Sequence, residues 1–380
     1  MLPRPQNPEE LAEALRSAAE LGGPIALEGG GSKRNMGGPL AETGTAISTA
    51  ALDRVFRYEP GDLTISVGAG MRYCELSRIL AANGQMLPLD PPFSSTATIG
   101  GILGANTSGP RRRLYGTARD FTIGMKFATL EGKLVESGGM VVKNVAGLDM
   151  AKLMIGSFGT LAAIASANFK VVPIPPCSRT FAAGFASASV ACEARNRILS
   201  SVLQPAAVDL LNPEASKRVG CEGFHLLVQG TGNSAAVARY GGALEGAETI
   251  EGERETELWN KLREFTPEFL AEHPEGAVVR ISCVLGDVAR AMESLKAPVV
   301  ARAGSGVLYA YFKSLQDARE AAEEAARRGW PAVVEYAPQV AKRDAVLWPA
   351  PGSDFAIMQR MKRLFDPNLL LNPKRLYGRI

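Results

Sequence analysis

The sequence predicts an α+β protein of two domains, and three observations lead to that class. A chain of 380 residues is longer than one ordinary hydrophobic core supports. Hydrophobic residues make up 46% and charged residues 21%, as in soluble globular proteins. Strand-like and helix-like segments occur in both halves, and a proline cluster at Pro173, Pro175 and Pro176 marks a boundary between them.

The first half is expected to begin with a helix over 7–22, because Leu11, Leu15 and Ala18 recur on one face. Glycine and proline end it, and further elements follow in order. We expect strands from residue 24 into a glycine loop, at 45–52 and at 63–70, followed by a helix at 72–84. An ordered binding loop is expected at 85–124. A hairpin at 125–139, turning at Glu131 and Gly132, and a strand at 161–173 complete this half.

The second half reads as an α+β cap domain with an antiparallel sheet. Expected strands are 180–185, 224–230, 277–285, 306–312 and 332–337, and expected helices are 188–202, 255–266 and 315–329. The stretch 230-GTGNSA-235 partly matches a dinucleotide fingerprint, but without a βαβ unit an ordinary strand-to-helix turn is expected. A helix and two proline-bearing loops close the chain after residue 354.

Charge and cysteine usage exclude several classes of protein. A net charge of +3 argues against a specialist for nucleic acid or membrane surfaces. No signal peptide and no apolar run long enough to span a bilayer is visible. The cysteines are odd in number and none are paired at CxxC spacing, so we expect no disulfide framework, zinc site or iron–sulfur site. A cytoplasmic setting is therefore expected. The cysteines are Cys74, Cys177, Cys192, Cys221 and Cys283.

The stretch 27-LEGGGSKRN-35 combines bare backbone with positive charge. Glycines let successive N–H groups form an anion-binding concavity, and Lys33 and Arg34 would attract a phosphate; a surface turn is an equal alternative. The Walker pattern is absent. Two more small-residue segments, 98–109 and 143–164, carry polar handles as well. Three such segments predict one large, flat, polar ligand with a diphosphate.

The order of these motifs resembles a known superfamily. It runs 29-GGGS-32, then 88-PLDP with ATIGG, AN, SG and YG, then KN-x-x-G-x-D-x-x-KL-x-x-GS-x-GTL. This is similar to the FAD-binding domain of the vanillyl-alcohol oxidase and D-lactate dehydrogenase superfamily, and within it to the FAD-binding subunits of bacterial glycolate oxidase (GlcE type). The resemblance covers about the first 172 residues, and 365-FDPNLLLNPKR is similar to the family's closing motif.

The resemblance implies a two-subdomain PCMH-type FAD-binding domain over 1–172, a cap or substrate domain over 173–345, and a C-terminal segment, 346–380, that returns to the FAD domain. It implies FAD held without a covalent bond. Carried over by position, the cofactor contacts would be Gly29, Gly30, Gly31, Ser32, Lys33, Pro88, Thr98, Gly100, Gly101, Asn106, Ser108, Gly109, Asp149, Lys152, Gly156, Ser157, Gly159, Ile164 and Asn372. Leu148, Phe158 and Ala162 depart from the family's pattern.

The implied reaction is oxidation of a small 2-hydroxy acid, glycolate to glyoxylate. It needs a base for the hydroxyl proton and a cation for the carboxylate. The chain has only two histidines and no paired-histidine motif, so no metal site is expected and no catalytic residue is assigned. His225 and Arg280 are weak candidates; a core histidine is the commoner reading of His225, and His273 looks like an exposed loop residue.

The arginine run after residue 110 has two readings. Arg111, Arg112 and Arg113 would steer a carboxylate or a partner, or form a solvated charge run. Lys143 is a weak candidate for a substrate-anion contact. None of the three tryptophans is expected to contact the flavin.

The few histidines and the missing iron–sulfur cysteines indicate an FAD-binding subunit of a glycolate oxidase complex. Expected partners are a second flavoprotein subunit and an iron–sulfur subunit, in the cytoplasm or peripheral to the inner membrane through the complex. Two alternatives stay open: a stand-alone FAD-dependent D-2-hydroxy acid (D-lactate) dehydrogenase, and a non-catalytic scaffold subunit.

Overall fold

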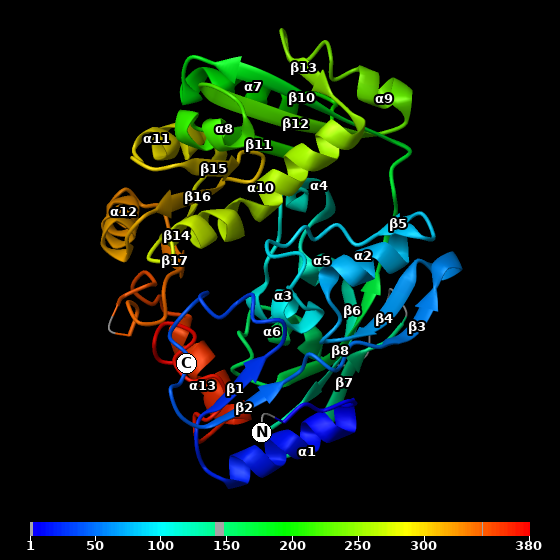
Figure 1. Ribbon diagram of the computed structural model, residues 1–380, viewed down its shortest axis with the longest axis vertical. Coiled ribbons are helices and arrows are strands. Elements are labelled where there is room, and N and C mark those ends of the chain that lie inside the picture. The colour runs from blue at the N-terminus through cyan, green and yellow to red at the C-terminus, as the bar shows by residue number, and fades with distance from the viewer. Residues whose placement is uncertain (1–2, 141–147, 344) are drawn as a thin grey trace. The chain divides into compact units, whose positions relative to one another are not determined.

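The computed structural model describes residues 3–140, 148–343 and 345–380 (Figure 1). The chain forms two compact units. The first unit comprises Met1–Ser108, Gly116–Ile174 and Ala350–Ile380, and the second comprises Gly109–Tyr115 and Pro175–Pro349.

The first unit is built on a five-stranded antiparallel sheet. Its order is β3 (Val55–Glu59), β4 (Thr64–Gly68), β8 (Ala163–Lys170), β6 (Thr122–Ala128) and β7 (Leu134–Gly138). The predicted hairpin is confirmed: β6 pairs with β7, and Gly132 takes φ +77° in the turn. The strand β3 was not predicted, because its Phe56 and Arg57 point to no buried face.

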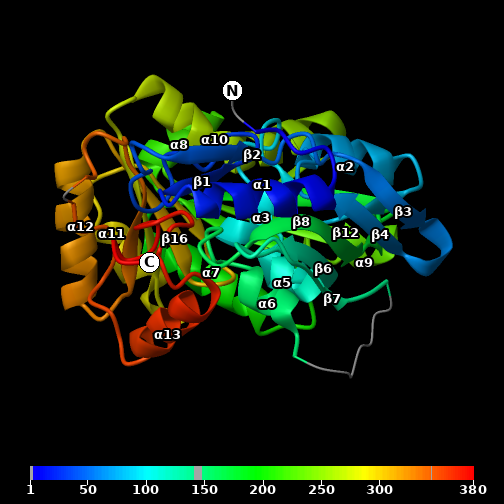
Figure 2. The same ribbon diagram turned by 90° about the horizontal axis from the view of Figure 1, so that it is seen from below.

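A parallel pair of strands, β1 (Ile25–Glu28) and β2 (Thr45–Ser48), stands apart from this sheet. The predicted first helix is α1 (Pro8–Glu20), and its Leu11 and Leu15 are fully buried against Ile25 and Ile47. Figure 2 shows α1 running along β1 and β2. Further elements of this unit are α2 (Tyr73–Ala81), a 3₁₀ turn (Pro60–Asp62), β5 (Gln85–Met86) paired with β9 (Val172–Pro173), α6 (Met150–Met154) and α13 (Phe355–Phe365).

The expectation of one loop over 85–124 is wrong, because the segment contains short helices: α3 (Ile99–Ala105), α4 (Arg112–Tyr115) and α5 (Ala118–Phe121). Glycines in α3 weaken its helix signal, but Ile99, Ile102 and Leu103 are completely buried and packing prevails. The carboxylate of Asp120 accepts a hydrogen bond from the Thr117 N–H at 2.7 Å, which starts α5. The tertiary environment thus overrides the loop-like composition.

The second unit contains the predicted antiparallel sheet, here with eight strands. Their order is β13 (Glu248–Ile250), β10 (Cys177–Phe185), β12 (Phe224–Gly232), β11 (Ala207–Leu211), β15 (Val299–Arg302), β16 (Val307–Phe312), β14 (Ala277–Ser282) and β17 (Ala332–Tyr336). Because β12 is antiparallel to both its neighbours, the fingerprint-like stretch 230–235 lies in no βαβ unit, and its reading as an ordinary turn is confirmed.

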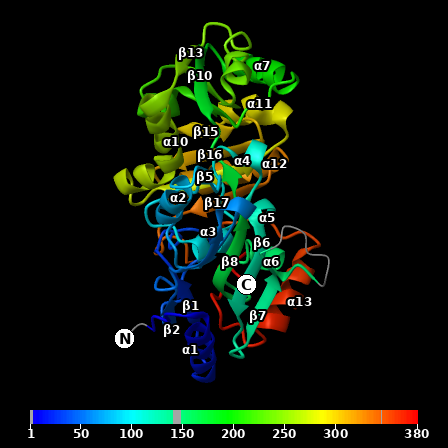
Figure 3. The same cartoon turned by 90° about the vertical axis from the view of Figure 1, so that its right-hand side faces the viewer.

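Helices cover both faces of this sheet. Figure 3 shows α10 (Gly252–Glu272) on one side and α7 (Ala188–Leu199), α11 (Val288–Glu293) and α12 (Leu315–Arg327) on the other. Every second strand residue, such as Val208, Leu226 and Ala301, belongs to the hydrophobic core under α7, α11 and α12. The other helices of this unit are α8 (Pro213–Val219), α9 (Ser234–Ala238) and a 3₁₀ turn (Leu285–Asp287).

Candidate cofactor site

An open pocket lies within the first unit, with a volume of about 920 Å³ when the solvent at its mouth is included. Three stretches predicted as cofactor walls meet in it: the glycine loop after β1, the start of α3, and the turn before β8. The predicted residues that line it are Gly29, Gly30, Gly31, Ser32, Lys33, Thr98, Gly100, Gly101, Gly159, Ile164 and Asn372.

The glycine loop presents a row of unused backbone donors. Within the described part of the chain, the N–H groups of Gly29, Gly30, Gly31 and Ser32 donate to no other residue. Exposed consecutive N–H groups form a concavity that binds anions. Lys33, the next residue, has its ammonium 5.2 Å from the centre of the Phe93 ring. The loop therefore offers hydrogen bonds and positive charge to an anionic ligand.

The glycines at 29 and 30 have a second physical reason. A Cβ at Gly30 would lie 1.7 Å from the carbonyl oxygen of Thr96, and one at Gly29 would lie 2.3 Å from Oγ1 of Thr98. The loop thus packs directly on the segment that leads into α3. Gly31 adopts φ +74°, a conformation that side-chain-bearing residues avoid. Two of the three glycines permit contact between the walls, besides leaving the ligand side bare.

The second wall is fixed by the cap of α3. Oγ1 of Thr98 accepts a hydrogen bond from the Gly101 N–H at 3.4 Å, so the threonine serves the helix start. Gly100 lets the helix approach the backbone of Ala69, where a Cβ would meet the alanine methyl at 3.0 Å. The N–H of Gly100 donates to the Ala69 carbonyl at 2.7 Å. This wall is therefore positioned by the protein itself.

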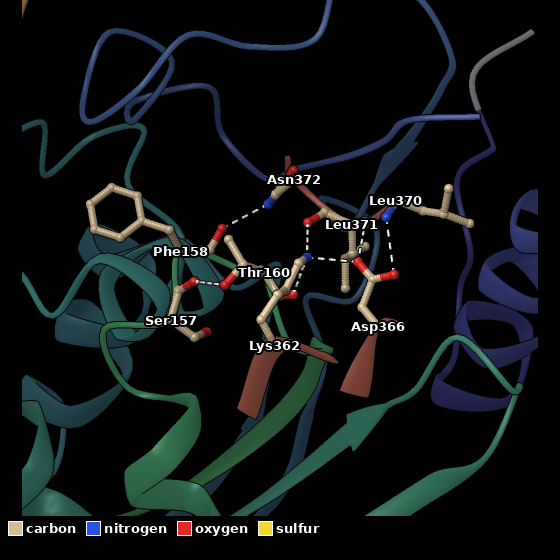
Figure 4. A network of polar contacts seen from close by, with 8 residues as sticks. All are labelled: Ser157, Phe158, Thr160, Lys362, Asp366, Leu370, Leu371 and Asn372. Atoms are coloured by element: carbon tan, nitrogen blue, oxygen red, sulfur yellow. Dashed lines mark hydrogen bonds and ion pairs between the residues drawn. The ribbon is translucent and has the colours of Figure 1, made fainter. Parts of the chain in front are cut away.

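The third wall and the C-terminal segment are joined by Asn372 (Figure 4). Its Nδ2 donates to the Phe158 carbonyl at 2.8 Å, and its Oδ1 accepts from the Leu27 N–H at 2.9 Å. One side chain thus links β1, which leads into the glycine loop, to the turn that carries Gly159. Gly159 has φ +65°, and a Cβ there would lie 2.7 Å from Nδ2 of Asn372.

A buried ion pair holds this C-terminal segment in place (Figure 4). Nζ of Lys362 lies 2.6 Å from Oδ2 of Asp366 and donates at 2.8 Å to the carbonyls of Thr160 and Leu371. Asp366 in turn accepts from the N–H groups of Leu370 and Leu371. Burial lowers the pKa of Lys362, and the contact with Asp366 opposes that effect. The network fixes the residues next to Asn372.

Eleven further lining residues, Arg375 among them, were not among the predicted cofactor contacts, although Arg34 was expected to attract a phosphate. They are Ala26, Leu27, Glu28, Arg34, Leu40, Thr49, Gly104, Ala105, Phe158, Ala162 and Arg375. Glu28 forms an ion pair with Arg34, with Oε1 and Nε 2.5 Å apart. Arg375 lies in the closing motif 365-FDPNLLLNPKR, which would have been the only sequence signal for it.

Eight predicted cofactor residues do not line this pocket: Pro88, Asn106, Ser108, Gly109, Asp149, Lys152, Gly156 and Ser157. Gly109 belongs to the second unit. Pro88 is buried, and Asn106 closes α3 at φ 49°. Oγ of Ser157 accepts from the Gly159 N–H at 3.2 Å, and the N–H of Gly156 donates to the Leu103 carbonyl.

Lys152 and Asp149 take part in local structure. Nζ of Lys152 donates to the carbonyls of Arg119 and Thr122, which ties α6 to the start of β6, and burial lowers its pKa. Asp149 caps α6 by accepting from the Lys152 N–H at 3.3 Å. Lys143 and the rest of 141–147 lie outside the described residues.

The two weak catalytic candidates both lie in the second unit, on the sheet face away from the α7, α11 and α12 core. They share one cross-strand row, in which His225 is followed by Leu211, Val300, Tyr309 and Arg280. Four interstrand steps separate them, about 19 Å at roughly 4.8 Å a step. The structure therefore does not bring His225 and Arg280 together around one small substrate.

Each candidate has its own surroundings. The His225 ring lies next to Gly184 on β10. Its Nδ1 is buried and has no hydrogen-bond partner among the described residues. Nε of Arg280 lies 3.2 Å from Oε1 of Glu335. Burial by itself would lower the pKa of Arg280, but Glu335 outweighs it and the pKa is raised. Arg280 is thus a partly neutralised cation.

The remaining candidates are placed as follows. Arg113 packs over Gly304, so the arginine run is not simply a solvated one. His273 follows the last residue of α10, and its ring packs against that of Phe269, with ring centres 4.7 Å apart and ring planes at 59°. His273 is half-buried, which corrects the exposed reading. In the part of the chain that the structure describes, no cluster of three metal-binding side chains occurs. Among the same residues, no helix is both long and apolar enough to cross a bilayer.

The pocket suits FAD by its donor set. A diphosphate needs hydrogen-bond donors and positive charge, which the N–H groups of 29–32, Lys33 and Arg375 supply. No cysteine or histidine is among its described lining residues.

Comparison with known proteins identifies the two ends of the chain. Residues 1–138 match the family described as "FAD binding domain", and residues 340–376 match "FAD linked oxidases, C-terminal domain". Glycolate oxidase subunit GlcE of Escherichia coli is 28% identical over 98% of both chains. Glycolate oxidase subunit GlcD of Bacillus subtilis is 29% identical over 55% of this chain, and D-lactate dehydrogenase of Archaeoglobus fulgidus is 30% identical over 45%. The chain spans less than half of either, 44% and 38%.

Solved structures show the same fold. An alkyldihydroxyacetonephosphate synthase superposes with a TM-score of 0.72 at 18% identity, covering 97% of this chain and 76% of that one. A 4-ethylphenol oxidase from Gulosibacter chungangensis superposes with a TM-score of 0.71 at 16% identity, covering 98% and 88%. At these identities the likeness concerns the fold alone.

Proposed function

We propose that this chain is the FAD-binding subunit of a glycolate oxidase complex, since its two ends match FAD-linked oxidase domains and mark it as an FAD-dependent oxidoreductase. The similarity to GlcE runs over 98% of both chains, so it includes the second unit as well as the FAD domain. The observation that carries the proposal is the pocket in which the unused N–H groups of 29–32 meet the start of α3 and the C-terminal segment.

In this proposal the pocket holds the extended cofactor without a covalent bond. The N–H groups of 29–32 and the charges of Lys33 and Arg375 face the diphosphate, while the bare backbone of Gly100, Gly101 and Gly159 leaves room beside it. When bound, FAD supplies the acceptor for the hydride that leaves the carbon bearing the hydroxyl group. The eight predicted contacts that do not line the pocket stay predictions.

The proposed division of the chain follows the sequence. Residues 1–172 and 346–380 would build the FAD domain, and 173–345 would form the cap or substrate domain. The C-terminal segment returns to β1 through Leu371, which bridges Ile25, and this supports including it in the FAD domain.

Partner subunits are part of the proposal because this chain lacks other means of passing electrons on. Its five cysteines are free and scattered, and its two histidines form no pair. A second flavoprotein subunit and an iron–sulfur subunit would supply the missing groups. The complex would lie in the cytoplasm, at the periphery of the inner membrane.

A second candidate function is a stand-alone FAD-dependent dehydrogenase for D-lactate or another D-2-hydroxy acid. Its support is the 30% identity to a D-lactate dehydrogenase, which covers 45% of this chain. Arg280, whose charge Glu335 partly neutralises, would be the cation for the substrate carboxylate. A scaffold without flavin is disfavoured by the unused donor row at 29–32.

Absorption and turnover together test these functions. The purified chain should show a flavin band that heat releases, and it should oxidise glycolate with an artificial acceptor only together with partner subunits isolated from its host. Turnover of D-lactate by the chain alone would favour the stand-alone enzyme. A colourless chain that takes up no FAD would refute both and leave the scaffold.

A further inference from the structure

Arg375 is a buried cation without a countercharge. It is 5% exposed, and no carboxylate among the described residues forms an ion pair with it. Burial lowers its pKa to about 10, and no charged neighbour opposes that shift. An isolated buried charge is costly unless something compensates it. The structure therefore maintains a positive charge here at a cost.

The guanidinium group holds the chain that follows the glycine loop. It donates to the carbonyls of Lys33 at 2.8 Å, Gly38 at 2.7 Å and Arg34 at 3.4 Å. In return, the N–H of Gly38 donates to the Arg375 carbonyl at 3.0 Å. Gly38 is required for this approach, because a Cβ there would lie 2.0 Å from the Lys374 carbonyl oxygen. Arg375 thus fixes residues 33–38 from one side.

Arg375 is also a residue of the pocket wall. Arg375 lines the pocket together with residues 29–34, and its guanidinium carbon is 5.9 Å from the centre of the Phe158 ring. Glu28, the acid in this wall, is already engaged by Arg34. The charge that remains on the loop side of the pocket is therefore positive.

We propose that Arg375 is the positioning residue for the cofactor's diphosphate: it orders the loop that presents the N–H groups of 29–32 and leaves its positive charge for the anion to compensate. The inference rests on the proposed function in that the ligand carries a diphosphate. By this inference the C-terminal segment contributes to cofactor affinity through Arg375, in addition to the glycine loop of the FAD domain. Charge-assisted contacts are the strong ones, so their loss is measurable.

The test compares two ligands on the full-length apo chain by flavin fluorescence titration. FAD has the diphosphate, whereas riboflavin has none. Arg375→Gln should weaken FAD binding by about 10- to 100-fold and riboflavin binding by less than about threefold. Arg375→Lys, which retains the charge, should recover part of the FAD affinity. Arg363→Gln removes an exposed cation from α13 and serves as the control, with both affinities unchanged.

Equal weakening of FAD and riboflavin would mean a merely structural role and would overturn the inference, as would unchanged FAD affinity in Arg375→Gln. If Arg375→Gln fails to fold by circular dichroism, Arg375→Lys decides. The inference expects that variant to keep the preference for FAD over riboflavin within about threefold, and loss of the preference refutes it. A wild-type chain that binds no FAD would refute the proposed function instead, which keeps the two failures distinct.

Discussion

Lys362 and Asp366, one helical turn apart at the end of α13, form an ion pair whose side chains are 2% and 0% exposed. The pair also satisfies the carbonyls of Thr160 and Leu371. It therefore connects the third wall of the cofactor pocket to the segment that supplies Asn372 and Arg375.

Lys362→Met should destabilise the protein by about 3–5 kcal/mol, because it leaves the Asp366 carboxylate buried and unpaired. Urea unfolding measures this free energy. The double variant Lys362→Met with Asp366→Asn should be more stable than Lys362→Met alone, since no buried charge remains. Arg363→Met, on the exposed neighbour, should change stability by less than about 0.5 kcal/mol. A loss for Lys362→Met no larger than that of this control would contradict the role of the pair.

Gly30→Ala should lower both stability and FAD occupancy. Its new methyl carbon would stand 1.7 Å from the Thr96 carbonyl oxygen, so the two walls must separate. Overpacking of this kind costs about 1–3 kcal/mol. Gly61→Ala is the matched control, because a Cβ there meets nothing within 4 Å and the residue is outside the pocket. Flavin content after purification and thermal unfolding provide the measurements. Wild-type flavin content in Gly30→Ala would sink the packing argument.

Substitutions of His225 and Arg280 should act independently on turnover. The two residues lie on one cross-strand row about 19 Å apart, too far for both to contact one small acid. The loss of transition-state stabilisation, calculated as RT ln of the wild-type to variant ratio of kcat/KM, should be additive. The loss in the double variant should equal the sum of the losses in His225→Gln and Arg280→Gln within about 0.3–0.5 kcal/mol. A coupling energy above about 1 kcal/mol would show that the two side chains act as a unit.

Cys283 should be a slowly reacting thiol with a pH-dependent contribution to stability. Burial, followed by the nearby Asp287 carboxylate, raises its pKa from 9.0 to about 11. Only the thiolate is alkylated, so at pH 8 the thiolate fraction is about a hundredfold below that of an unshifted thiol. Iodoacetamide followed by mass spectrometry should modify the exposed Cys74 well before Cys283.

The sign of the stability effect follows from the raised pKa. Between pH 9 and about 11 the folded state binds the Cys283 proton that the unfolded state has lost, so stability falls as pH rises through this window. Cys283→Ala should lessen that fall in urea unfolding at pH 8 and pH 10.5. An identical fall in the variant would assign the effect to other groups.

The sequence by itself determined which segments are rich in glycine, which form amphipathic helices and which form strands. The succession of strand and helix candidates predicted the antiparallel sheet of the second unit, and the order of the motifs carried the resemblance that implied FAD and a subunit of the GlcE type. These properties are local, because helix and strand periodicity and glycine's backbone freedom act within a few residues.

Only the tertiary structure decided why Gly29 and Gly30 are glycines, since their close neighbours are Thr98 and Thr96. It also separated Lys152, which holds α6, from the residues that line the pocket. Arg375 reaches the carbonyl of Lys33 across 342 residues of chain, and Asn372 reaches Leu27 across 345. Contacts of that range depend on how whole elements pack together, and no local pattern of residues encodes them.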